Sequence, residues 1–252
     1  MTGRVLVLAC AMVMAGACQQ RDASPTPRRL VGMALLTQTH DFYKELEKAA
    51  REEARARNIE LSIVACEMDP AKQAAQIEDF VTQGVVALVV APCDSDAIGP
   101  QLAAVERAGI PVFTADIAAR QGKVVSHVAS DNEKGGRLAA QTMAKLLGER
   151  GNVLILDHPT VASVQDRTKG FQEELAKYPG MRIVGRPSAD GQRARAMAVM
   201  EDMLQTHGDL NGVFVHTDIK SQVVSGNDCV LREILGYTTA DHKKPALFIF
   251  RQ

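Results

Sequence analysis

The stretch LVGMALLTQTHDFYKELEKAAREEARARNIELSIVAC, residues 30–66, decides the fold class of this 252-residue chain. It consists of an apolar run, an amphipathic segment of helix length and a second apolar run. Apolar residues recur at three- and four-residue spacing in the middle segment, which predicts one buried helix face: Phe42, Leu46, Ala49 and Ala50. The charged residues between them are expected to face water: Lys44, Glu45, Glu52 and Arg55. This order predicts a β/α unit whose two apolar runs lie in one parallel sheet.

The same alternation continues for about 100 residues, the length of an ordinary domain. Strands are predicted at residues 30–36, 61–66, 85–91, 111–115 and 124–129. Helices are predicted between them at residues 41–57, 70–83 and 95–108. Asn58 and Gly109 each follow a helix and precede a strand, where a left-handed cap residue is expected.

A second block of the same kind begins after Ser130-Asp131-Asn132. Its predicted helices are 133–147, 164–177 and 192–206, and its predicted strands are 153–157, 182–185 and 212–216. Two successive blocks predict an α/β fold of two doubly wound parallel-sheet lobes, residues 30–131 and 132–218, joined at a hinge. Ligands of open parallel sheets bind beyond the carboxyl ends of the strands, so two facing lobes are expected to hold one ligand between them.

The N-terminus has the layout of a secretory signal. A single basic residue, Arg4, precedes the apolar run 5–14, and small residues lead to Cys18. The run is too short to span a bilayer, which takes roughly 20 apolar residues. Residues 1–17 are therefore expected to be removed as a signal peptide. The small residues before Cys18 resemble the lipobox of bacterial lipoproteins, which implies lipidation of Cys18; the alternative is an ordinary signal with an incidental cysteine.

Composition narrows the function of the rest of the chain. The polar segment 18–29 contains Pro25 and Pro27, as expected of a tether between a membrane and a folded body. The hydrophobic content of 46% supports a large core, and the net charge of -1 offers no basic surface for nucleic acid.

The cysteines of the folded body do not suggest a special site. Cys66, Cys93 and Cys229 are widely spaced and form no CxxC pair, so neither a zinc site nor a disulfide framework is expected. Cys66 lies in an apolar strand-like run, which predicts a small core residue.

Several short segments of the sequence resemble those of a known protein family. They lie at residues 94–97, 108–112 with Asp116, 125–136, 165–171 and 212–218. Together they resemble the ribose-binding protein branch of the periplasmic sugar-binding proteins, over residues 30–218. The resemblance implies the type I periplasmic-binding-protein fold and a non-catalytic receptor that delivers its ligand to the permease of an ABC-type importer.

The resemblance also implies ligand contacts. Phe42 and Tyr43 fall where the family places two aromatics that sandwich a sugar ring. Asp116 matches an aspartate that accepts hydrogen bonds from sugar hydroxyls, and Arg167 matches the arginine of the second lobe. Ser130, at the hinge, is a further candidate.

Each of these residues also has a structural interpretation. Phe42 lies on the apolar helix face and can be a packing residue, whereas Tyr43 lies off that face and is expected to be exposed toward the cleft. Asp116 or Ser130 can cap a helix, and Arg167 can be a surface helix residue.

Other family contact positions carry different residues here. His40, Ala91, Ile117, Gly191 and Thr217 stand where the family has polar or aromatic contacts. His40 and Thr217 remain candidate ligand residues. Unpaired buried polar groups cost about 1–3 kcal/mol each, so a ribose-specific site would not survive these changes. The resemblance therefore implies a binding role and leaves the ligand open.

The resemblance to the family ends near Asp218. Residues 219–252 contain one possible helix, 230–235, and one apolar run, 246–250. This segment is expected to be a divergent or truncated end of the second lobe, lacking the C-terminal strands of the family. A shifted reading frame is one explanation, and impaired ligand binding is one consequence.

The combined prediction is an exported, lipid-anchored solute-binding protein of the periplasm or cell envelope. It is expected to be monomeric, to use no cofactor or metal, and to capture a sugar-like molecule for an ABC importer. A ligand-sensing subunit for a membrane signalling receptor is the alternative. An enzyme is not indicated, because the six histidines accompany no HExxH, P-loop or GxSxG motif, and His127 is expected to be a core residue.

Overall fold

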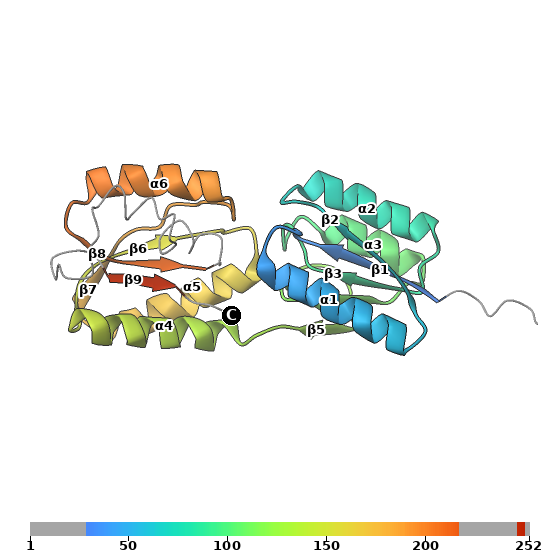
Figure 1. Cartoon of the computed structure of the whole chain (residues 1–252), viewed down its shortest axis with the longest axis horizontal. Helices are drawn as coiled ribbons and strands as arrows, with labels where there is room; N and C mark the ends of the chain where they lie inside the picture. Colours follow the sequence, from blue (N-terminus) through green and yellow to red (C-terminus); the bar gives the residue numbers. More distant parts are fainter. Residues whose placement is uncertain (1–28, 217–245, 250–252) are drawn as a thin grey trace, which may run out of the picture.

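Two parallel β-sheets form the framework of the chain (Figure 1). The computed structural model describes residues 29–216 and, for the backbone alone, residues 246–249. We call the part of the chain around the first sheet the first lobe and the part around the second sheet the second lobe. Figure 1 shows the two lobes side by side, each with helices on both faces of its sheet. Within the part of the chain that the structure describes, no helix is long and apolar enough to span a bilayer.

The first lobe has a five-stranded sheet in the order β2-β1-β3-β4-β5, with all neighbouring strands parallel. Its strands are β1 (Leu30–Leu35), β2 (Glu60–Ala65), β3 (Ala87–Val90), β4 (Val112–Ala115) and β5 (Ser126–Val128). Its helices are α1 (Asp41–Ala56), α2 (Pro70–Thr82) and α3 (Gly99–Arg107). Asn58 and Gly109 have φ of 53° and 73°, which confirms the predicted left-handed caps.

The second lobe has a four-stranded parallel sheet in the order β7-β6-β8-β9. Its strands are β6 (Arg150–Leu156), β7 (Gly180–Gly185), β8 (Leu210–Val215) and β9 (Ala246–Ile249). Its helices are α4 (Asn132–Leu147), α5 (Ala162–Leu175) and α6 (Arg193–Thr206). The predicted fold class of two doubly wound parallel-sheet lobes is confirmed. The exact domain boundaries remain a prediction.

Glycines bring α4 and α5 into backbone contact in the second lobe. A Cβ added to Gly136 would lie 1.9 Å from the carbonyl oxygen of Arg167, and one added to Gly170 would lie 2.0 Å from that of Glu133. Only a residue without a side chain permits this approach. The ring of Phe171 on α5 stacks on that of Phe214 on β8, with centroids 4.0 Å apart. This packing fixes α5, the helix that carries Arg167.

Three details of the first lobe differ from the prediction. Helix α1 packs Phe42, Leu46 and Ala50 against the core as predicted, but Ala49 is exposed, and Tyr43 and Ala54 are buried beside that face. Helix α3 begins at Gly99, because the Asp94 carboxylate accepts the N–H groups of residues 96 and 97 and holds the chain in a turn before the helix. His127 is exposed because β5 is the edge strand of its sheet, and the core assignment was wrong.

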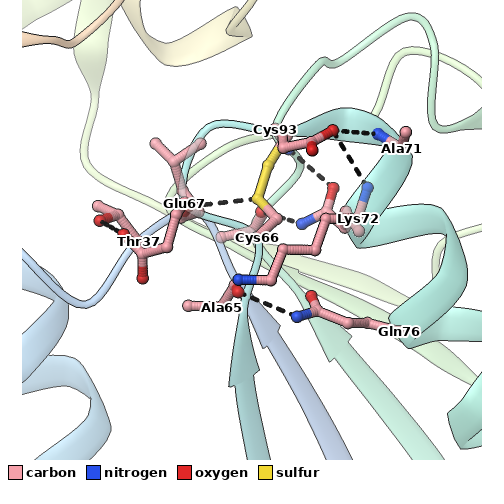
Figure 2. Close-up of a disulfide and its surroundings, with 12 residues drawn as sticks. Thr37, Ala65, Cys66, Glu67, Ala71, Lys72, Gln76 and Cys93 are labelled. Carbon is pink, nitrogen blue, oxygen red and sulfur yellow. Dashed lines mark hydrogen bonds between the residues drawn. A yellow bond between two sulfur atoms is a disulfide. The ribbon is translucent and has the colours of Figure 1, made fainter.

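A disulfide joins Cys66 to Cys93, which corrects the expectation that no disulfide is present (Figure 2). Cys66 follows β2 and Cys93 follows β3, and β1 lies between these strands in the sheet. The loops after the two strands therefore reach the same sheet edge, with Cα atoms 7.0 Å apart. Both cysteines are buried, so the core position predicted for Cys66 is confirmed. The sequence spacing could not reveal the pairing, because it depends on strand order.

Opening this disulfide is expected to lower the free energy of unfolding by about 2–4 kcal/mol, since it closes a loop of 27 residues in the unfolded chain. Denaturant unfolding with and without dithiothreitol measures the loss. The Cys93→Ala variant is the control, because it should start at the reduced protein's stability and show no response to dithiothreitol. A wild-type protein that is equally stable in both conditions would contradict a structural role for the bond.

Candidate ligand-binding site

A cavity of about 490 Å³ lies between loops of the two lobes. First-lobe residues after β1 and β2 and at the start of α1 line one side, and second-lobe residues between β7 and α6 line the other. The lining residues are Thr37, Thr39, His40, Asp41, Lys44, Glu67, Met68, Gly191, Gln192 and Arg193. The cavity lies beyond the carboxyl ends of parallel strands, where this kind of sheet binds its ligands. Its volume is in the usual range for small-molecule pockets, about 300–1,000 Å³.

Hydrogen bonds fix the first-lobe wall. The hydroxyl of Thr37 donates to Glu67 Oε2 at 2.5 Å, and the N–H of Gln38 donates to Glu67 Oε1 at 3.0 Å. Glu67 and Met68 both have left-handed backbone angles, with φ of 52° and 68°. The loop after β2 therefore holds a carboxylate and a thioether in defined positions at the cavity.

The second-lobe wall comes close to the first lobe at Gly191. This residue has a φ of +71°, and a Cβ there would lie 3.1 Å from Met68 Cε and 3.3 Å from His158 Nδ1. The resemblance to the family implies an aromatic at this position, whereas this chain has glycine. Glycine here accommodates both the backbone angle and the neighbouring Met68 side chain.

The cavity wall carries charges of both signs. Lys44 pairs with Asp41 at 2.8 Å, while Glu67 and Arg193 contribute one further charge of each sign. Such a lining offers donors and acceptors for a hydroxyl-rich molecule. Among the described residues, no group of three or more His, Cys, Asp or Glu side chains is arranged to hold a metal ion.

Tyr43 is buried at the lobe junction rather than exposed to a cleft. Only 2% of its surface is accessible, and its hydroxyl donates to Asp116 Oδ2 at 2.7 Å. Phe42 is half-buried and packs edge-on against Tyr43, with ring centroids 5.2 Å apart. Burial, followed by the charge of Asp116 and the hydrogen bond to it, raises the pKa of Tyr43 well above its ordinary value. The phenol therefore stays protonated and remains a donor.

Asp116 lies at the end of β4 with a φ of +66° and is half-buried. The next element is strand β5, so Asp116 does not cap a helix and that interpretation is wrong. Asp131, rather than Ser130, caps α4 by accepting the N–H of Lys134 at 3.0 Å. Ser130 is exposed at the hinge.

Arg167 is buried on α5, with 2% of its surface accessible, so it is not a surface helix residue. Its guanidinium donates to the carbonyl oxygen of His216 at 2.8 Å and to Asn132 Oδ1 at 2.5 Å. These bonds tie the second turn of α5 to the end of β8 and the start of α4. The guanidinium is thereby held at the carboxyl edge of the second sheet.

The structure groups the sequence-predicted residues in three ways. His40 lines the cavity, Phe42, Tyr43 and Asp116 form one cluster behind it in the first lobe, and Arg167 lies in the second lobe. Neither Asp116 nor Arg167 lines the 490 Å³ cavity itself. Cys18 and Thr217 lie outside the described residues.

Sequence reasoning missed most of the cavity lining. Thr37, Glu67 and Gln192 carry no motif, but each lies within a few residues of the carboxyl end of a strand or the start of the following helix. A search of every strand end for polar side chains would have identified them. Helix length and strand order decide which of these loops meet, and the residues alone do not show that.

These features define a two-lobed α/β protein of the type I periplasmic-binding fold. Residues 31–225 match the family described as periplasmic binding protein domain, and the chain belongs to this family. It is 37% identical to the ribose import binding protein of Bacillus subtilis, over 75% of this chain and 61% of that protein. It is 30% identical to a xylitol-binding protein of Mycolicibacterium smegmatis, over 80% of this chain and 58% of that protein.

A solved structure shows the same fold. An ABC transporter solute-binding protein from Mycobacterium smegmatis with bound glycerol is 34% identical and superimposes with a TM-score of 0.76, over 82% of this chain and 72% of that one.

The chain spans roughly 60% of the length of the two curated relatives (61% and 58%). The family consists of non-catalytic binding proteins, which confirms the prediction that the chain is not an enzyme, and it implies an extracytoplasmic location.

Tyr43→Phe is expected to remove a pH dependence of stability in the alkaline range. A tyrosine in the unfolded chain ionises near pH 10, and the raised pKa keeps Tyr43 protonated in the folded state. Above that pH the unfolded state loses its proton first, so the stabilisation present below about pH 10 is progressively lost. Urea unfolding at about pH 9 and about pH 11 should show a larger loss of stability for wild type than for Tyr43→Phe. Equal losses would contradict the burial of this hydroxyl.

Proposed function

We propose that the chain is an exported solute-binding protein that captures a small polyhydroxylated molecule, a monosaccharide or polyol, for an ABC importer. The observation that carries this proposal is the cavity of about 490 Å³ between the strand ends of two parallel-sheet lobes. The relatives described above are named for ribose and xylitol, and the solved structure contains glycerol. All three compounds present closely spaced hydroxyl groups, which the mixed donors and acceptors of the cavity wall can bind.

The proposed contacts come from both lobes. Asp116 and Arg167 lie at the carboxyl edges of the two sheets and do not line the 490 Å³ cavity, so the ligand is proposed to extend from the cavity toward them. Asp116 accepts a hydrogen bond from Tyr43, and a carboxylate has room for further donors, so ligand hydroxyls can bind it as well. Charge-assisted bonds of this kind are stronger than neutral ones. Arg167 is the proposed contact from the second lobe, with His216 and Asn132 holding its guanidinium in place. Phe42, His40, Ser130 and Thr217 are the remaining proposed ligand residues.

Thermal unfolding in the presence of D-ribose, D-arabinose, xylitol and glycerol tests the proposal. A ligand that binds only the folded state stabilises it by about 2.7 kcal/mol at 100 times its Kd, so at least one of these compounds should raise the Tm. Asp116→Asn should require at least about tenfold more ligand than wild type for the same rise in Tm, because the substitution removes the negative charge that strengthens the hydrogen bonds to the ligand.

The matched control is Asp79→Asn, an exposed aspartate on α2 far from the cavity lining, which should respond to ligand like wild type. If none of these four pentoses and polyols raises the Tm, the capture of such ligands is rejected. An undiminished response in Asp116→Asn would instead reject Asp116 as a contact.

We further propose that Cys18 is lipidated and anchors the protein to the membrane. The support is the sequence layout of an apolar run, small residues and Cys18. Cys18→Ser is expected to move the protein from the membrane fraction to the soluble fraction of the cell envelope. Immunoblotting of the two fractions measures this, with Cys229→Ser as the control that should stay with the membrane. Membrane association that survives Cys18→Ser would contradict the anchor.

A further inference from the structure

The two lobes are joined by hydrogen bonds at a place away from the 490 Å³ cavity. Ser95, in the loop between β3 and α3, is fully buried. Its N–H donates to the carbonyl oxygen of Thr160 at 2.9 Å, and its hydroxyl oxygen accepts the N–H of Ala162 at 2.9 Å. Thr160 and Ala162 belong to the second lobe and flank the start of α5, so one first-lobe serine bonds to both sides of that helix terminus.

The bond to Ala162 is a helix cap that comes from the other lobe. The first N–H groups of a helix have no partner within the helix, and a side chain just before it usually accepts one of them. The residue at the N-cap position of α5 is Val161, which has no side chain able to do so. Ser95, 67 residues earlier in the chain, supplies the acceptor instead.

The loop that carries Ser95 is rigidly held in the first lobe. The Ser95 carbonyl oxygen accepts the N–H of Arg120 at 2.8 Å. Gln73 accepts the N–H of Cys93 at 2.8 Å and donates to the carbonyl oxygen of Ala91 at 2.9 Å. Cys93 is also held by the disulfide to Cys66 (Figure 2). The cap is therefore presented to α5 by a fixed loop and not by a mobile one.

Apolar and polar contacts surround this cap. Val161 and Val164 of the second lobe are 2% and 4% exposed and pack in one cluster with Tyr43 and Ile117 of the first lobe. The Arg120 side chain donates to Gln165 and lies 3.9 Å from the carboxylate of Asp166. Separation of the lobes at this junction would remove the cap from α5 and expose both valines to water.

We propose that Ser95 is a lobe latch: it caps α5 only when the lobes are closed and so sets the equilibrium between closed and open forms. Arg167 lies on the same helix, in the turn that follows the capped one. The latch therefore also fixes the position of the proposed second-lobe contact without lining the cavity. Ser95 is therefore expected to influence the affinity for the ligand without touching the ligand.

Small-angle X-ray scattering of the purified protein, with no ligand added, tests the latch. The loss of a helix cap costs about 0.5–2 kcal/mol, which corresponds to a fall of about 2- to 30-fold in the ratio of closed to open molecules in Ser95→Ala. The radius of gyration should therefore rise, and the amide of Ala162 should exchange its hydrogen faster in mass-spectrometric measurements. Because no ligand enters this measurement, its outcome is independent of whether the proposed sugar binding is correct.

Asp69→Ala is the matched control. Asp69 caps α2 by accepting the N–H groups of Ala71 and Lys72, so its loss removes a helix cap within the first lobe alone. This variant should lose stability but keep the wild-type radius of gyration. Arg120→Ala, at an exposed side chain, should increase the radius as Ser95→Ala does. A wild-type radius in Ser95→Ala, or an equal increase in Asp69→Ala, would overturn the latch.

Discussion

The parallel direction of the strands is the constraint on which the rest of this structure depends. When all strands of a sheet run the same way, every loop that follows a strand lies at one edge. In the first lobe this rule collects Thr37, Glu67 and Ser95 at the same edge, although they belong to three different loops. The second lobe presents Gly191 and the start of α5 in the same way. The cavity and the junction between the lobes both result from these two edges meeting.

The junction combines apolar and polar contacts with different tasks. The buried cluster of Tyr43, Ile117, Val161 and Val164 gives the lobes a non-directional attraction, since its burial removes apolar surface from water. The bonds of Ser95 to Thr160 and Ala162 add direction, because they form in only one relative position of the lobes. A ligand in the cavity can favour the closed form only through contacts that the open form lacks. The contacts between the lobes outside the cavity therefore determine how much binding free energy the ligand must supply to shift the equilibrium to the closed form.

The phenol of Tyr43 connects the junction to the proposed site. It packs in the apolar cluster between the lobes and donates to Asp116 at the end of β4. The hydrogen bond orients a carboxylate that is proposed to bind ligand hydroxyls. The same side chain thus supports the lobe contact and positions a polar group, which explains why a tyrosine rather than a second phenylalanine suits this position.

Periodicity predicted the elements of the fold well, because strands buried on both faces and helices with one apolar face leave distinct patterns. The predicted limits of α1, from residue 41, and of β1, from residue 30, agree with the structure at their starts. Side-chain direction was harder to predict. Tyr43 is predicted to be exposed but is buried, and His127 is predicted to be buried but is exposed. The side of α1 that faces the core and the edge position of β5 depend on neighbours that are distant in the sequence.

Contacts between distant loops could not be predicted from the sequence at all. The Cys66–Cys93 disulfide requires knowledge of the strand order, and the cap from Ser95 requires knowledge of how the lobes meet. The most direct test of the central claim, that the two sheet edges form one binding crevice, is a crystal structure of the protein grown with D-ribose or xylitol. The account predicts electron density for the ligand between the lobes, with a hydroxyl within hydrogen-bond distance of Asp116. Ligand bound on an outer face of either lobe, with the crevice filled by water alone, would contradict it.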